Sequence, residues 1–179
     1  MTATPGVTSH DLIARARAGH AEALEAIYVQ HGVVLMRLAY HLTGSAADAE
    51  DVLHDVFLGL PEALTRYEER GLFSAWLRRV TTRVALDRIR SARRRREIPL
   101  DGAHEPAMAS SERAVAHRSE LERALATLPV ALRVVFVLKE IDGQSHAEIA
   151  GTLGIRVGTS EVRLHRACEK LRRYLKEGR

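Results

Sequence analysis

The fold is decided by residues 143–167, GQSHAEIAGTLGIRVGTSEVRLHRA. This stretch predicts two helices joined by a tight turn. Ser145 is placed to cap the first helix, and Glu148, three residues later, completes a capping box. Gly154 suits the left-handed residue that ends a helix. We therefore expect the first helix to stop there and the second to begin near Gly158.

The second helix of this pair is predicted to have one apolar and one cationic face. Such a helix, presented after a tight turn, can lie in the major groove, which makes duplex DNA the first candidate partner. A charged helix face is more often merely solvated, so on this segment alone a purely structural hairpin remains the alternative. The inward residues are expected to be Leu164, Cys168, Leu171 and Leu175, and the cationic face consists of Thr159, Arg163, Arg166, Lys170 and Arg173.

Composition favours a helical protein with a buried core. The 179 residues are 46% hydrophobic and 28% charged, whereas aromatic residues make up only 4%. The abundance of Ala, Leu and Arg favours helix throughout. The single cysteine, Cys168, excludes an internal disulfide. Because we find neither an apolar leader nor an apolar run long enough to cross a membrane, we expect a soluble cytoplasmic protein without membrane insertion.

The distribution of charge predicts two different partners. Residues 75–96 contain nine arginines and one aspartate, whereas residues 45–62 contain five acids and no Lys or Arg. The net charge of +4 conceals this separation. An acidic surface and a strongly basic surface on one chain suit ligands of opposite charge.

Turn and capping signals divide the chain into two small all-α domains. Residues 97–111 combine Pro, Gly and small residues without periodicity, which predicts a flexible linker. The linker separates an N-terminal helical domain, residues 1–96, from a C-terminal helix-turn-helix domain, residues 112–179. Ser74 is an expected N-cap, and Pro61 is expected to break the regular helix near residue 59 and to open a short final turn. The helices expected before the helix-turn-helix cover residues 9–19, 20–43, 45–59, 75–93, 112–127 and 129–142.

Three aspartates are expected to share one face of the helix at residues 45–59. Asp48, Asp51 and Asp55 are spaced by three and four residues. As carboxylates for acid–base catalysis they lack a complementary nucleophile, a glycine-rich phosphate loop and any metal-ligand spacing. We therefore expect no enzyme activity, no cofactor and no metal. A partner-docking surface is the better functional interpretation, and a merely solvated acidic face is the alternative.

Aromatic residues precede the arginine-rich helix. Tyr67, Phe73 and Trp76 fall within ten residues of a chain that is poor in aromatics. Single-stranded nucleic acid is bound by aromatic faces that stack on bases, beside cations that neutralise phosphate. The alternative is that Phe73 and Trp76 belong to the core, which leaves Tyr67 the least constrained of the three. Arg79, Arg83, Arg90 and Arg94 are expected to continue the cationic track along the outer face of the helix.

Three motifs in this order resemble bacterial sigma factors of the extracytoplasmic-function (ECF) group. Residues 44–58, GSAADAEDVLHDVFL, are similar to the helix with which the family binds core RNA polymerase. Residues 73–80, FSAWLRRV, followed by residues 85–90, ALDRIR, are similar to its helix for promoter melting and minus-ten recognition. The helix-turn-helix is similar to the domain that reads the minus-thirty-five element. The similarity covers residues 10–96 and 112–176.

The resemblance implies a sigma factor that directs promoter-specific transcription initiation, while the polymerase performs the bond chemistry. Its partners would be the largest and second-largest subunits of core RNA polymerase, duplex and melted promoter DNA, and an anti-sigma factor. By resemblance, polymerase binding falls to Asp48, Asp51, His54, Asp55 and Phe57. The resemblance also implies that the minus-ten element is bound by Tyr67, Phe73, Arg79, Arg83, Arg90 and Arg94. It implies that the minus-thirty-five element is bound by Arg156, Thr159, Ser160, Glu161, Arg163, Arg166 and Lys170.

Four residues depart from the family pattern. Arg83 stands where many relatives have Asn, which alters a base contact. His54 stands where many have Gln, so one docking hydrogen bond would change with pH. Glu161 replaces a basic residue; it can accept from cytosine N4 but repels phosphate. Cys168 also replaces a basic residue, which removes one more phosphate contact.

The rival class is a stand-alone transcription regulator with a C-terminal helix-turn-helix and a helical sensor or dimerisation domain. Such a regulator typically binds a palindromic duplex site as a dimer. It needs no polymerase-docking face, so the acidic helix distinguishes the two classes.

Overall fold

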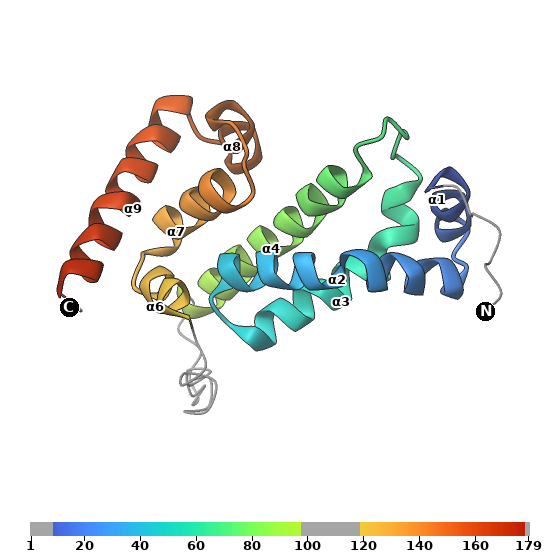
Figure 1. Ribbon diagram of the computed structural model, residues 1–179, viewed down its shortest axis with the longest axis horizontal. Helices are drawn as coiled ribbons and strands as arrows, with labels where there is room; N and C mark the ends of the chain where they lie inside the picture. The colour runs from blue at the N-terminus through green and yellow to red at the C-terminus, as the bar shows by residue number, and fades with distance from the viewer. Residues whose placement is uncertain (1–8, 98–118, 178–179) are drawn as a thin grey trace, which may run out of the picture.

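The computed structural model describes residues 9–97 and 119–177, and every regular element in these ranges is helical (Figure 1). The all-α prediction is confirmed for this part of the chain. The predicted linker lies, from residue 98 on, outside the described residues, as does the start of the predicted helix 112–127. The N-terminal unit consists of α1 (Ser9–Arg17), α2 (Ala21–Thr43), α3 (Ala46–Leu64) and α4 (Phe73–Glu97). The C-terminal unit consists of α6 (Glu120–Ala126), α7 (Val130–Phe136), the π-helical turn η1 (Val137–Ile141), α8 (His146–Leu153) and α9 (Val157–Glu177).

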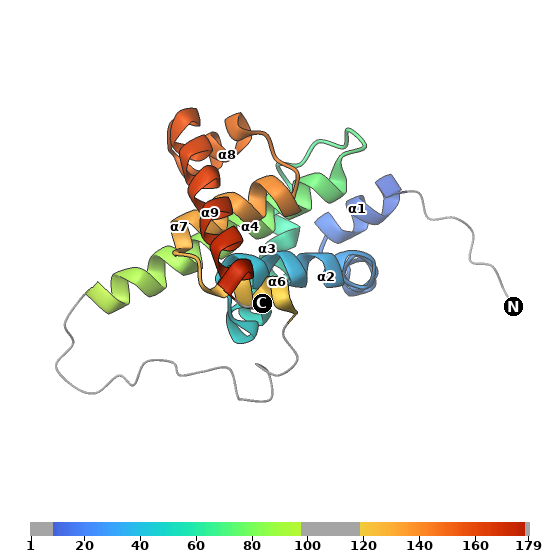
Figure 2. The same ribbon diagram turned by 60° about the vertical axis from the view of Figure 1, so that its left-hand side comes forward.

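The N-terminal unit packs α2, α3 and α4 around an apolar core. α2 ends at Gly44, whose φ is 77° and whose N–H donates to the Tyr40 carbonyl at 2.7 Å. Ser45 then caps α3 by accepting from the Asp48 N–H at 3.3 Å. This short connection reverses the chain, so α2 and α3 lie side by side (Figures 1 and 2). The fully buried side chains of this unit include Ile27, Leu35, Leu42, Val52, Leu60 and Leu77.

The helix α3 does not end near residue 59 as predicted but continues through Pro61 to Leu64. An internal proline costs about 3 kcal/mol, because it removes one helical hydrogen bond and crowds the preceding turn. Leu60 and Leu64 are both fully buried, and burying a leucine contributes roughly 1.5–3 kcal/mol. The burial of these two side chains therefore outweighs the proline.

The helix α4 begins at Phe73, two residues before the predicted start, so Ser74 lies inside its first turn and is not its N-cap. The Trp76 N–H donates to the Leu72 carbonyl at 2.9 Å, which extends this turn. Phe73 is buried, with its ring centre 5.5 Å from that of Tyr67 and 5.8 Å from that of Trp76. Packing among these rings, which are separated in sequence, extends the helix.

The predicted helix-turn-helix is present. Ser145 Oγ accepts from the Glu148 N–H at 3.2 Å, and Glu148 Oε2 accepts from the Ser145 N–H at 2.9 Å, so the capping box is complete. Gly154 ends α8 with a φ of 64°. One detail of the prediction is wrong: Leu175 is 43% exposed rather than inward. The predicted helix 129–142 is present as α7, which the π-helical turn η1 continues to Ile141.

The C-terminal unit packs directly on the N-terminal unit. α7 and η1 contact α2, and in Figure 1 α7 lies near the end of α2 that leads into α3. Buried side chains from both units belong to one continuous core. The sequence predicted two domains without placing them, and in the structure they form one closed body.

Candidate nucleic-acid and partner interfaces

Asp48, Asp51 and Asp55, hereafter the acidic face, do share one side of α3. Their side chains are 47%, 57% and 51% exposed, so they are accessible to a partner. Arg88 of α4 reaches across to all three. Its Nε donates to Asp48 Oδ1 at 3.1 Å, it pairs with Asp51, and its Nη1 lies 3.9 Å from Asp55 Oδ2. One cation against three carboxylates leaves the acidic face net negative and ties α3 to α4.

An apolar groove between α2 and α3 lies next to the acidic helix and was missed by the sequence analysis. Its volume is about 590 Å³, and Tyr28, Val29, Val33 and Leu53 are among its lining residues. Tyr28, Val29 and Val33 are 49%, 74% and 70% exposed. Val29 and Val33, four residues apart on α2, were the available sequence signal.

His54 and Phe57, also expected to bind polymerase, flank these surfaces differently. His54 is exposed on α3. Phe57 is half-buried, and its ring meets that of Tyr28 edge to face with centres 5.1 Å apart. Phe57 therefore supports the wall between α2 and α3 rather than projecting from it.

Tyr67 belongs to an aromatic cluster with Phe73 and Trp76 at the start of α4, and its ring is buried there rather than open to solvent. Tyr67 and Phe73 are both buried, and the ring centre of Tyr67 lies 4.7 Å from that of Trp76. The Tyr67 hydroxyl donates to Glu69 Oε1 at 3.2 Å. Burial, and then the neighbouring Glu69 carboxylate, raise the pKa of the Tyr67 phenol, so it remains a neutral donor.

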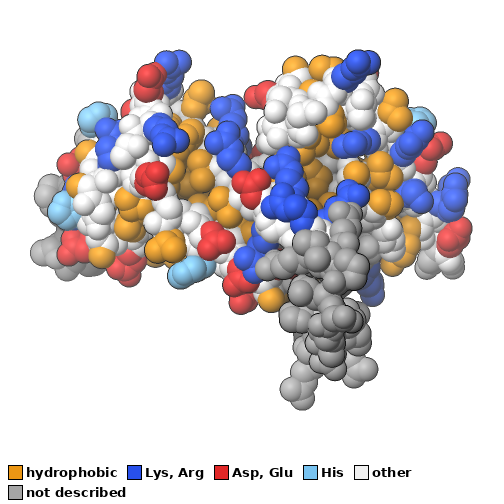
Figure 3. All heavy atoms as spheres, turned by 180° about the vertical axis from the view of Figure 1, so that it is seen from behind, with side chains coloured by type: hydrophobic (Ala, Val, Ile, Leu, Met, Phe, Trp, Pro, Cys, Tyr) orange, Lys and Arg blue, Asp and Glu red, His pale blue; other side chains and the backbone are white. Residues whose placement is uncertain are grey.

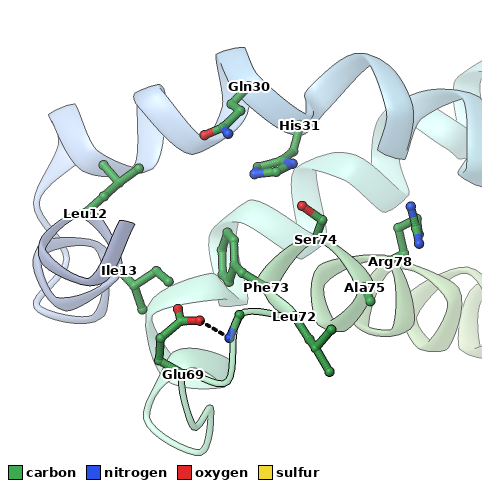
Figure 4. A pocket seen from close by; sticks show the side chains of 11 residues that line it. Leu12, Ile13, Gln30, His31, Glu69, Leu72, Phe73, Ser74, Ala75 and Arg78 are labelled. Carbon is green, nitrogen blue, oxygen red and sulfur yellow. Dashed lines mark hydrogen bonds between the residues drawn. The ribbon is translucent and has the colours of Figure 1, made fainter. Parts of the chain in front are cut away.

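A pocket of about 320 Å³ opens beside this cluster between α1, α2 and the start of α4 (Figure 4). Figure 4 shows Gln30 and His31 of α2 facing Phe73 and Ser74 across it. Burial lowers the pKa of the His31 imidazole, which favours its neutral form. At the rim Glu69 Oε1 accepts from the Gly71 N–H at 2.7 Å and orders the turn. A mixed polar and aromatic lining of this size suits a planar, hydrogen-bonding ligand.

Arg79, Arg83, Arg90 and Arg94 all lie exposed along one side of α4, and we call them the basic face. Arg90 Nη1 donates to Asp87 Oδ1 at 3.0 Å, and Arg94 Nη2 donates to Ser91 Oγ at 3.0 Å. Arg79 Nη2 reaches Glu148 of α8 at 3.5 Å. Figure 3 shows Lys and Arg side chains gathered over the middle of the rear face of the molecule. Such a track can hold a nucleic-acid backbone.

The predicted recognition helix, α9, presents most of its predicted residues to solvent. Ser160 is the exception: it is fully buried, and its Oγ lies 2.9 Å from His146 Nδ1 of α8. The Ser160 hydroxyl, which was expected to contact DNA, therefore lies in the corner between α8 and α9 and is not exposed to a ligand. Arg163 is half-buried and lines a cavity of about 510 Å³ beside α4. Arg156, Glu161, Arg166 and Lys170 are exposed, and Thr159 is half-buried.

Comparison with known proteins identifies the family. The family model described as Sigma-70 region 2 matches residues 27–95, and the one described as Sigma-70, region 4 matches residues 118–171. The ECF RNA polymerase sigma factor SigL of Mycobacterium tuberculosis is 36% identical over 171 residues, which cover 92% of this chain and 96% of SigL. The chain belongs to the ECF sigma factors.

Two further relatives place this sigma factor within the group. SigM of Mycobacterium tuberculosis is 32% identical over 167 residues, which cover 92% of this chain and 83% of SigM. SigE of Mycolicibacterium smegmatis is 38% identical over 152 residues. That match covers 82% of this chain but 59% of SigE, so the sigma factor described here spans little more than half the length of that relative.

Solved structures share its architecture. CnrH, solved in complex with the cytosolic domain of CnrY, is 29% identical with a TM-score of 0.58, covering 93% of this chain and 96% of the CnrH chain. The sigma factor RpoE of Bartonella quintana, solved with the anti-sigma factor NepR, is 22% identical with a TM-score of 0.62 and covers 87% and 98% of the two chains. The latter likeness concerns the fold alone.

The family matches coincide with the surfaces described above. The region 2 match runs from α2 to α4, which carry the acidic face and the basic face, and the region 4 match runs from α6 into α9. Within residues 9–97 and 119–177 of this sigma factor, no helix is long and apolar enough to cross a membrane. In the same residues no cluster of three His, Cys, Asp or Glu has the arrangement of a metal site.

Proposed function

We propose that this sigma factor docks on core RNA polymerase through its acidic face, on the α4 side of α3, and the apolar groove on the α2 side of the same helix, and directs it to a subset of promoters. The proposal is carried by one observation: three half-exposed carboxylates lie on a single side of α3, in the same N-terminal unit as a separate basic face. Net negative charge attracts and orients a cationic partner helix. The apolar groove on the α2 side of the same helix supplies surface whose burial stabilises the complex.

The expected partner of the acidic face is the coiled-coil clamp of the largest polymerase subunit. His54, exposed on the same helix, extends this surface. The C-terminal unit would rest on the flap of the second-largest subunit, with the linker threading toward the polymerase channels. Because the polymerase would bind both units, it would fix the distance between the two DNA-reading surfaces.

For the minus-ten element, we propose that the pocket between α1, α2 and α4 receives a flipped base of the melted non-template strand. Gln30, His31 and Ser74 line this pocket and can hydrogen-bond a base edge. Phe73 forms its aromatic wall, and Tyr67 supports Phe73 from behind. The basic face of α4 then holds the strand through its phosphates.

For the minus-thirty-five element, we propose that α9 enters the major groove of duplex DNA. Arg163, Arg166 and Lys170 supply base and phosphate contacts. Glu161, exposed near the start of α9, favours cytosine through its N4 amino group and disfavours phosphate. Ser160 is left out of this set because its hydroxyl is engaged by His146 inside the fold.

The remaining roles follow from the family. The chain performs no bond chemistry, because the polymerase synthesises the RNA, and it works in the cytoplasm where the polymerase is found. An anti-sigma factor is a further partner. This role is supported by the likeness to CnrH, which was solved bound to the cytosolic domain of CnrY.

The test is in-vitro transcription with purified core polymerase on a promoter library. Charge reversal by Asp51→Lys together with Asp55→Lys should abolish association with core polymerase and therefore transcription. The fold should survive, because exposed ion pairs contribute only about 0–1 kcal/mol each. Glu62→Lys, at an exposed acid of the same helix outside the acidic face, is the matched control and should leave both activities intact. Undiminished polymerase binding by the double variant would refute the docking role.

The same experiment separates the rival stand-alone regulator. A regulator of that kind binds a palindromic duplex tightly without polymerase. If the free chain bound one duplex site tightly and specifically, and core polymerase added nothing, the regulator would replace the sigma factor as the function of this chain.

A further inference from the structure

The carboxylate of Glu69, in the turn before α4, has one oxygen in use and one without a donor. Glu69 Oε1 accepts from the Tyr67 hydroxyl at 3.2 Å and from the Gly71 N–H at 2.7 Å. Glu69 Oε2 is buried, and no donor among the described residues reaches it. Buried polar atoms without a partner are rare in folded proteins, and each one calls for an explanation. Because the two hydrogen bonds to Oε1 fix the carboxylate, Oε2 is held in one place.

Glu69 belongs to the wall of the pocket between α1, α2 and the start of α4. Figure 4 shows its carboxylate turned toward Ile13 and Phe73, with one oxygen bonded to the Gly71 N–H. Gln30 and Ser74 are exposed at this pocket, whereas Phe73 is buried and Glu69 is half-buried. The pocket therefore opens between Gln30 and Ser74, and the Glu69 carboxylate lies deeper.

A carboxylate at this depth distinguishes between bases by their hydrogen-bonding groups. A flipped base is read through its Watson–Crick edge, and an ionised carboxylate can only accept hydrogen bonds. Cytosine presents the donating N4 amino group, whereas thymine and uracil carry the accepting O4 at the same position. An O4 placed against Glu69 Oε2 would bring two acceptors together and leave both unsatisfied, which is costly in a buried site.

The other groups of the pocket suit the rest of a cytosine edge. Cytosine N3 and O2 are acceptors, and the Gln30 amide and the Ser74 hydroxyl can donate to them. The half-buried His31 ring also lines the pocket and, in its neutral form, carries one N–H. These donors and the Glu69 acceptor come from α2, α4 and the turn before α4, so one base can meet all of them.

A purely structural role for Glu69 is the alternative. Through Oε1 the side chain orders the turn from Tyr67 to Gly71, and this role needs no ligand. It explains Oε1 but not the burial of Oε2 without a donor. The neighbouring acid, Glu68, shows the contrast, because its side chain is 74% exposed, pairs with Arg70 and does not line the pocket.

We propose that Glu69 is a specificity-determining residue for the minus-ten element. Its Oε2 accepts a hydrogen bond from the N4 amino group of a flipped cytosine and disfavours thymine at the same position. The proposal rests on the base-binding pocket proposed above and adds the choice of base. A hydrogen bond to a charged group sets the size of the preference, which should be about tenfold to a hundredfold in affinity at one position of the non-template strand.

Glu69→Gln should reverse this preference. The Tyr67 hydroxyl and the Gly71 N–H both require an acceptor, so the amide oxygen of the glutamine takes the place of Oε1. The amide NH₂ group then takes the place of Oε2. This group donates, so it matches O4 of thymine or uracil and opposes the N4 amino group of cytosine. The variant retains both hydrogen bonds of the turn and should therefore remain folded, which circular dichroism checks.

The experiment uses the full chain in complex with core RNA polymerase. Promoter probes with a single-stranded minus-ten segment carry deoxycytidine or deoxyuridine at each position of the non-template strand in turn, and their affinities are compared by competition. These two nucleotides have rings of the same size, so shape does not enter the comparison. At one position the native chain should favour deoxycytidine, and Glu69→Gln should favour deoxyuridine. Glu68→Gln removes the same charge from the adjacent exposed residue and should behave as the native chain does.

Each result bears on the proposal. A preference that disappears in Glu69→Gln without reversing would still assign the choice of base to the carboxylate. The proposal would be overturned if the native chain preferred deoxycytidine at no position, if a folded Glu69→Gln kept the native ratio, or if Glu68→Gln changed the ratio equally. An unchanged ratio in Glu69→Gln would leave the sigma function intact. Failure of that function would appear instead as no complex with core polymerase for the native chain, and would overturn both proposals.

Discussion

Gly44→Ala gives a stability change whose size follows from the structure. Alanine at a φ of 77° is strained, and an L-residue in the left-handed region costs about 1–2 kcal/mol. The new Cβ would also lie 2.8 Å from Arg133 Nη1. Arg133 Nε donates to the Leu42 carbonyl at 3.3 Å and its Nη2 donates to the Thr43 carbonyl at 2.9 Å, so the guanidinium must move away from both carbonyls. Losing hydrogen bonds to a charged group costs about a further 1.5–3 kcal/mol. We expect a total loss of about 2.5–5 kcal/mol.

Gly19→Ala separates the two contributions. Gly19 follows α1 with a φ of 81°, but a Cβ there would have no atom within 4 Å. Gly19→Ala should therefore lower the free energy of unfolding by the cost of backbone strain alone, about 1–2 kcal/mol. In an Arg133→Ala background there is no guanidinium to displace. The loss of stability caused by Gly44→Ala should then be as small as the loss caused by Gly19→Ala.

The assay is urea unfolding followed by circular dichroism at 222 nm, with thermal unfolding as a second probe. About 2–4 °C of Tm is expected for each kcal/mol in a cooperative unit of this size. Equal losses for Gly44→Ala and Gly19→Ala would refute the reasoning, because the contact with Arg133 would then contribute nothing. Additive losses in the Gly44→Ala, Arg133→Ala double variant would refute it as well, since residues that interact should not be additive.

Three further outcomes are expected. Arg163→Ala should weaken minus-thirty-five duplex binding by the polymerase complex by about 1–3 kcal/mol if the side chain reads a base, as measured by competition among promoter variants; a uniform loss for all sequences would mean that it contacts phosphate only. Ser160→Ala should lower stability by roughly 1 kcal/mol, because the His146 ring loses its partner, while a promoter-preference assay stays unchanged; altered preference would return Ser160 to the DNA surface. Hydrogen bonds from the Ser145 N–H, and then from the Ser145 hydroxyl, lower the pKa of the Glu148 carboxyl in the folded protein. The ionised Glu148 therefore stabilises the fold at pH values above the pKa of the unfolded state. This contribution to the free energy of unfolding is lost as the pH falls through the lower pKa of the folded state. The difference in Tm between the native chain and Glu148→Gln should therefore shrink on acidification through the range below about 4.5, and a constant difference would contradict this.

Short-range signals predicted most of the helical framework. The capping box at Ser145 and the left-handed Gly154 depend on residues within a few positions of one another, and both are present. The acidic face was predicted for the same reason, since residues three and four apart on a helix share a side. Arg88 as its counter-ion was not, because the ion pairs join residues of α3 and α4 about forty positions apart.

Where the sequence analysis was wrong, long-range packing had overruled a local preference. Pro61 remains inside α3 because Leu60 and Leu64 are buried by other helices. Tyr67 and Ser160 are buried by neighbours that no spacing rule identifies, so their side chains are not exposed as the sequence led us to expect.

By itself the sequence determined that this chain is helical, that it ends in a helix-turn-helix, and that its acids and arginines lie on different helices. Helix periodicity, capping and charge depend on neighbouring residues, so they can be predicted from the sequence without coordinates. Only the tertiary structure decided which of those charges face outward and that the two units close on each other. Both depend on contacts such as Arg133 with Leu42 and Thr43, whose partners lie some ninety residues apart and meet only when the core has formed.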